Sequence, residues 1–70
     1  MVGMIKIFLN GFPEMVPEGI TITELIHRFE EKDGDLIVER NGRFVYPQKY
    51  QVIAASEGDR IEFINPNFGG

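Results

Sequence analysis

The chain contains no cysteine and a single histidine, and its basic residues are outnumbered by acidic ones. Without cysteine, neither a disulfide framework nor a thiolate metal site is available to stabilise the fold. No apolar run approaches the ~20 residues that a membrane-spanning helix needs. The first six residues also lack the basic start and long apolar centre of a signal peptide. We therefore expect no bound metal, no membrane partner and residence in the cytoplasm.

The charge balance narrows the range of partners. Seven Lys and Arg residues are scattered along the sequence against eleven Asp and Glu residues, giving a net charge of −4. Nucleic acids are bound by clustered basic side chains, so we expect no nucleic-acid partner. An acidic surface is better suited to docking on a basic protein. Seventy residues, 43% of them hydrophobic, are enough for one folded domain with a thin core.

The N-terminal part of the sequence predicts a β-hairpin. Apolar residues alternate over positions 4–9, which is typical of a strand with one buried face. Asn10-Gly11 then favours a type I′ turn, because both residues tolerate a positive φ. The return strand covers about residues 12–16 and contains Pro13, which cannot donate to a ladder. We therefore expect this second strand at an edge of the sheet.

The clearest helix signal begins at Thr21. Thr21 and Glu24 have the spacing of a capping box, and Ile20 is placed to pack on Leu25 as a hydrophobic staple. The apolar residues that follow recur at the spacing of a buried helical stripe. They are Ile22, Leu25, Ile26 and Phe29. Gly34 is a helix stop signal, which predicts one helix of about eleven residues.

The remaining sequence predicts three more strands. Strands over 36–40 and 44–46 are joined by Asn41-Gly42, a second hairpin turn. The stretch 47–56 shows no clean period and has room for a short helical turn, and 60–64 reads as a last strand. Strands surrounding one helix predict an α+β domain with the helix across one face of the sheet.

Three segments and the last two residues carry a resemblance to a known family. They are Ile7-Phe8-Leu9-Asn10-Gly11, Val38-Glu39-Arg40-Asn41-Gly42, Glu57-Gly58-Asp59-Arg60-Ile61-Glu62-Phe63 and Gly69-Gly70. In this order they resemble the ubiquitin-like (β-grasp) sulfur carriers, especially those of the thiamine pathway, over essentially the whole chain. The approach Asn65-Pro66-Asn67-Phe68 is closer to the molybdopterin-type carriers. The resemblance therefore defines the class more firmly than the pathway.

The resemblance implies a β-grasp fold, with a mixed sheet of about four or five strands packed on one helix. The last strand is expected inside the sheet, beside the first strand and parallel to it. The residues expected in the core include Ile5, Ile7, Leu25, Phe29, Ile61 and Phe63. Residues 1–64 would form the domain, and residues 65–70 a flexible tail, in which no turn or hydrophobic stripe is evident.

The resemblance also implies the chemistry. Gly70 would carry the reactive C-terminal carboxylate, and Gly69 would let it enter enclosed active sites, because glycine has no Cβ. An E1-like adenylyltransferase would use ATP to adenylate the carboxylate, and a sulfur donor such as a cysteine desulfurase would convert it to a thiocarboxylate. A thiazole synthase or the large subunit of molybdopterin synthase would take the sulfur. The carrier itself would be no enzyme and would bind no cofactor.

Two sets of side chains are expected to contact partners. The first lies in the tail, where an aromatic residue has no core to join, and comprises Pro66, Asn67 and Phe68. The second is an exposed apolar patch on the sheet face that the helix leaves uncovered, and comprises Phe8, Phe44 and Tyr46. His27 lies away from the helical stripe and is expected to be a solvated residue rather than a catalytic or metal-binding one.

Three other functions stay open on the sequence alone. The chain could supply sulfur for molybdopterin or another metabolite. It could be a protein modifier whose Gly70 is joined to a lysine amine, or a β-grasp interaction module with no chemistry at its end.

Overall fold

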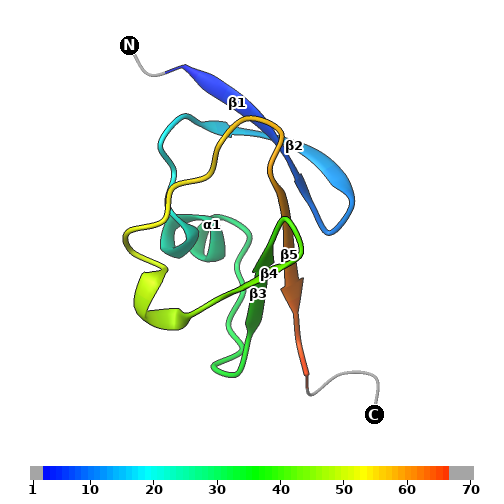
Figure 1. Cartoon of the computed structure of the whole chain (residues 1–70), viewed down its shortest axis with the longest axis vertical. Helices are drawn as coiled ribbons and strands as arrows, with labels where there is room; N and C mark the ends of the chain where they lie inside the picture. The colour runs from blue at the N-terminus through cyan, green and yellow to red at the C-terminus, as the bar shows by residue number, and fades with distance from the viewer. Residues whose placement is uncertain (1–2, 67–70) are drawn as a thin grey trace.

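The structure is a computed structural model that describes residues 3–66. Within this range, five strands form one sheet, and one α-helix and a short 3₁₀ helix lie on one side of it (Figure 1). The elements are β1 (Met4–Leu9), β2 (Phe12–Pro17), α1 (Ile22–Arg28), β3 (Ile37–Arg40), β4 (Arg43–Val45), η1 (Pro47–Lys49) and β5 (Arg60–Ile64). The strand order is β2-β1-β5-β3-β4. This arrangement confirms the predicted β-grasp fold.

The centre of the sheet joins the first strand to the last. β5 runs parallel to β1, with Leu9 opposite Ile61, and antiparallel to β3 on its other side. Ile61 and Phe63 point toward the helix and are 0% and 6% exposed. The predicted position and register of the last strand are therefore confirmed, and β5 has neighbours on both edges.

Both predicted hairpin turns are present. Asn10 and Gly11 have φ angles of 51° and 86°, and Asn41 and Gly42 have 53° and 81°. Two successive positive φ angles are the signature of the type I′ turn, whose twist matches that of the strands. β2 is the edge strand beside β1, as Pro13 predicts.

The core fills the space between the sheet and α1. It consists of Ile5, Ile7, Leu9, Val16, Ile20, Ile22, Leu25, Val38, Val45, Ala55, Ile61 and Phe63. Ile26 and Phe29 pack against it but are only partly buried. Burial of a fully enclosed aliphatic side chain contributes about 1.5–3 kcal/mol, so this small cluster supplies most of the drive to fold.

The beginning of α1 follows the sequence prediction. Thr21 Oγ1 accepts from the Glu24 backbone N–H at 3.2 Å, and Glu24 Oε1 accepts from the Thr21 N–H at 2.9 Å. The two contacts complete the capping box. The irregular segment after β4 satisfies two further donors of the first turn, since Ile53 and Tyr50 carbonyls accept from Ile22 and Thr23.

The end of α1 differs from the prediction. The helix has seven residues instead of about eleven and ends at Arg28, well before Gly34. Glu30 adopts φ 56°, the Glu30 N–H donates to the His27 carbonyl, and the Glu31 N–H donates to the Ile26 carbonyl. These bonds form a Schellman motif, which normally places glycine at the left-handed position. The sequence does not predict this helix end, because glutamate occupies the position at which glycine is expected.

We expect Glu30→Gly to raise the free energy of unfolding by about 1 kcal/mol, because glycine adopts a positive φ without the steric cost borne by glutamate. Urea denaturation at neutral pH measures the change. Gly34→Ala is the matched control: a Cβ at Gly34 meets no atom within 4 Å, and we expect little change. A Glu30→Gly variant that is no more stable than wild type would contradict this account of the helix end.

Candidate functional site

The candidate site is the C-terminal segment of the chain, which begins where β5 ends. Ile64 is the last residue of β5, and Asn65 and Pro66 continue the chain toward Gly70. With its amide nitrogen oriented toward the loop after α1, Asn65 donates to Glu31 Oε1 and Asp33 Oδ2, both at 3.2 Å. The first residue of the sequence-predicted tail therefore has hydrogen-bond partners in the domain.

The asparagines of the two hairpin turns hold β5 from both sides. Asn10 donates its N–H to the Ile61 carbonyl at 2.9 Å and accepts from the Phe63 N–H through Oδ1 at 2.8 Å. Asn41 makes the equivalent pair of bonds to Arg60, at 2.7 Å and 2.8 Å. Each asparagine side chain thus replaces a missing strand partner and extends the ladder along β5.

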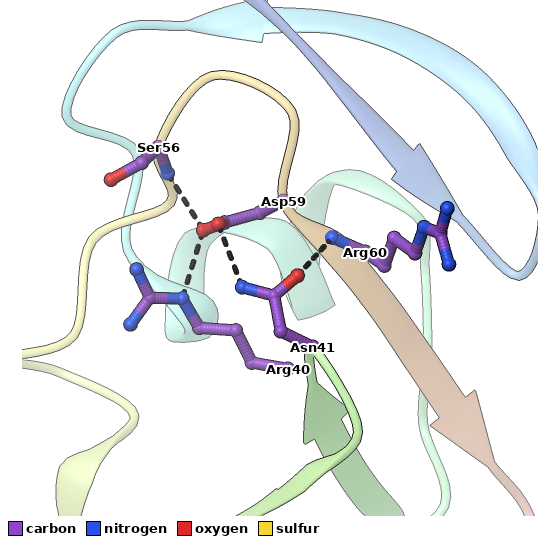
Figure 2. A network of polar contacts seen from close by, with 5 residues as sticks. All are labelled: Arg40, Asn41, Ser56, Asp59 and Arg60. Carbon is purple, nitrogen blue, oxygen red and sulfur yellow. Dashed lines mark hydrogen bonds and ion pairs between the residues drawn. The ribbon is translucent and has the colours of Figure 1, made fainter.

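The buried carboxylate of Asp59 adds further hydrogen bonds at the start of β5 (Figure 2). Asp59, 6% exposed, accepts from Arg40 Nε at 2.8 Å, from Asn41 Nδ2 at 3.0 Å and from the Ser56 N–H at 2.8 Å. Burial alone would raise the pKa of Asp59, but the Ser56, Asn41 and Arg40 contacts outweigh it and hold that pKa below its usual value. The charged carboxylate of Asp59 therefore links β3 and the β3–β4 turn to the start of β5 through hydrogen bonds.

We expect Asp59→Ala to lower the free energy of unfolding by about 2–3 kcal/mol, because donors on Ser56, Asn41 and Arg40 lose their acceptor. The folded-state pKa lies below the unfolded value, so the stabilisation by the carboxylate is complete above about pH 4 and is lost as the pH falls through the folded-state pKa. Denaturation at neutral and acid pH measures both effects.

Asp59→Asn is the control, since it keeps the shape of the side chain and cannot titrate. The difference in stability between wild type and Asp59→Asn should shrink as the pH falls from neutral to acid. A difference that stays constant with pH would show that the charge of Asp59 does not stabilise the fold.

The sheet face opposite α1 carries an apolar patch next to the end of β5. Residues on each strand alternate, so Val38, Val45 and Phe63 are buried while their neighbours point to the other face. The neighbours that lie together are the half-buried Ile37 and the exposed Phe44, Tyr46 and Ile64, which we call the tail-side patch. Ile37 is opposite Ile64, and the rings of Phe44 and Tyr46 meet edge to face at 4.9 Å. Phe44 and Tyr46 are 50% and 61% exposed.

The structure does not bring the three sequence-predicted aromatic residues into one patch. Phe8 lies on β1, with β5 and β3 between it and Phe44 on β4. Its ring is half-buried, and Lys6 Nζ lies 5.6 Å from the ring centroid. The predicted single patch is therefore wrong: the last strand was expected beside β1, but the sequence does not reveal that β3 also lies between β1 and β4.

The other predicted site residues are placed as follows. Pro66 is exposed just beyond β5, whereas Asn67, Phe68, Gly69 and Gly70 lie outside the described residues. His27 is exposed on α1, and no group of three or more His, Cys, Asp or Glu residues within positions 3–66 could hold a metal. No helix in the same range is long and apolar enough to cross a membrane.

Sequence reasoning missed three residues that position the site: Asn10, Asn41 and Asp59. The two asparagines were recognised only as turn residues, and Asp59 only as part of a turn. The signal that could have found them is that both turns use asparagine, the residue whose side chain can stand in for a backbone acceptor.

A mixed sheet wrapped on one helix, with its last strand central and running out toward the chain end, defines a ubiquitin-like β-grasp protein. Residues 7–70 match the model of the ThiS family. The structure is similar to that of a thiamine biosynthesis protein (ThiS) from Geobacter metallireducens, with a TM-score of 0.82 and 26% identity over 94% of this chain and 100% of that chain. A comparison with curated proteins gave no match. The chain belongs to the ThiS family.

Proposed function

We propose that this chain is a sulfur carrier of thiamine biosynthesis and acts as a co-substrate of other enzymes. The observation that carries the proposal is the match to the ThiS family, which extends through Gly70 and so includes the Gly-Gly pair. The structural similarity to a thiamine biosynthesis protein supports the same pathway.

The reactive group is the carboxylate of Gly70, which is a poor electrophile until it is activated. An E1-like adenylyltransferase joins it to AMP from ATP and releases pyrophosphate. A sulfur nucleophile, supplied by a donor such as a cysteine desulfurase, then displaces AMP and leaves a thiocarboxylate. A thiazole synthase takes this sulfur. In this scheme the carrier contributes its terminal carboxylate, and the partner enzymes supply the acid–base chemistry.

The length of chain after β5 limits where the activating enzyme docks. The four residues after Pro66 extend at most about 13 Å, so the active site has to approach Pro66, two residues beyond the end of β5, within that distance. The tail-side patch lies there, since Ile64 belongs to both β5 and the patch. Its exposed aromatic rings are the kind of side chain that anchors protein interfaces. We therefore place the docking surface for the activating enzyme on this patch.

Deleting Gly70 tests the proposed chemistry. The new carboxylate on Gly69 ends about 3.5 Å short of its required position, and errors of 1 Å can cost about 100-fold in rate. We expect almost complete loss of thiocarboxylate formation with the adenylyltransferase, ATP and a sulfur donor. Mass spectrometry of the intact carrier detects the exchange of one oxygen for sulfur.

A thermal melt accompanies that assay as the control for folding. The deletion should melt like the full chain, because Gly70 has no side chain with which to bury apolar surface. A deletion variant that folds normally and still gains sulfur at the full rate would contradict the proposed function. Conjugates to lysine amines in place of the thiocarboxylate would indicate a protein modifier.

Phe44→Ala tests the docking surface. Loss of an interface aromatic residue typically costs about 2 kcal/mol of binding, so we expect the KM for the carrier in the adenylation reaction to rise about 30-fold. Phe12→Ala is the matched control, because Phe12 is 69% exposed but lies on β2 at the other edge of the sheet. Equal KM values for the two variants would exclude the tail-side patch as the docking surface.

A further inference from the structure

Two carboxylates face each other next to the tail-side patch. Glu39 on β3 and Glu62 on β5 are directly opposite in the antiparallel register. Both lie on the open face, because their neighbours Val38, Ile61 and Phe63 are buried toward α1. Like charges that are directly opposite across two strands destabilise a sheet. The isolated chain thus carries an unfavourable pair near the middle of its sheet.

Neither carboxylate is compensated within the part of the chain that the structure describes. The carboxylate groups of Glu39 and Glu62 make no hydrogen bond or ion pair there, and the ion pair found in this part joins Arg40 to Asp59. Arg60, two residues before Glu62, is the nearest cation on the same face of β5. Figure 2 shows its side chain extending away from Asp59, and it too forms no ion pair among residues 3–66. Glu39, Glu62 and Arg60 together therefore carry a net negative charge on the open face of the sheet.

The surface between these side chains is hollowed. A hollow of about 480 Å³ is lined by Glu39, Glu62, Arg60 and the turn residues Asn41 and Gly42. It borders the tail-side patch through Glu39, which is opposite Phe44. A partner that covers Phe44 and the adjoining hollow also covers these carboxylates and removes water from around them. Covering them without a counter-charge would be costly, because a carboxylate loses its hydration.

We propose that Glu39 and Glu62 together receive a lysine or arginine side chain of the activating enzyme when it covers the tail-side patch. This inference rests on the proposed function and names the partner chemistry that the carrier selects. The paired carboxylates act as specificity-determining residues: they favour a partner with a cation at this position and disfavour one that covers them with an apolar or acidic surface.

The proposal predicts opposite effects on folding and on docking. In the free carrier, replacing the two carboxylates by amides removes their mutual repulsion and should stabilise the fold. In the complex, the same replacement removes the counter-charges of the partner cation and should weaken docking. A purely structural role for Glu39 and Glu62 would move both measurements in the same direction.

The test uses the double variant Glu39→Gln/Glu62→Gln in the full chain, with the E1-like adenylyltransferase of the same organism as the probe. We expect kcat/KM for carrier adenylation to fall about tenfold through KM, with kcat unchanged. The melting temperature should rise by about 2–5 °C. The kcat/KM of wild type should also fall more steeply with salt than that of the variant, since salt screens the ion pair.

Glu14→Gln/Glu18→Gln is the matched control, because it removes the same two charges from β2 and the turn that follows it. If the Glu39/Glu62 variant and the control have the same KM while wild type is adenylated, the inference is overturned and the proposed function stands. If wild-type carrier is not adenylated at all, the proposed function fails and the inference fails with it.

Discussion

The pairing of β5 with β1 is the contact on which the rest of the structure depends. It joins the last strand to the first, buries Ile61 and Phe63 against the helix, and brings β3 and β4 into the same sheet. The hydrogen bonds of Asn10, Asn41 and Asp59 all end on β5 or the residues just before it. These polar contacts therefore hold in place the strand that precedes the proposed reactive end of the chain.

The sequence predicts the architecture well because its local signals agree with one another. Asn-Gly pairs fix two type I′ turns, Pro13 marks an edge strand, and the capping box fixes the first turn of α1. The end of α1 could not be predicted, because Glu30 adopts a left-handed conformation against its own preference. Phe29, at which the helix ends, packs against the core directly before this left-handed residue.

The candidate site was only partly predictable from the sequence, because it depends on which strands are neighbours in the sheet. Alternation along single strands correctly places Phe8, Phe44 and Tyr46 on the face that α1 leaves uncovered. Whether residues on one face also touch depends on the full strand order, and β3, as well as the expected β5, lies between β1 and β4 and separates Phe8 from the other two. The facing carboxylates Glu39 and Glu62 are likewise visible only once the register of β3 and β5 is known.

The central position of β5 has a consequence for how the protein is made. Asn10 and Phe63, which share a hydrogen bond, are 53 positions apart in a chain of 70 residues. Contacts of such high sequence separation form late and slow folding, because a long loop has to close first. A nascent or truncated chain that lacks β5 cannot complete the sheet or order the tail-side patch. Only a chain synthesised through β5 can display the proposed docking surface, so unfinished copies would not occupy the proposed activating enzyme.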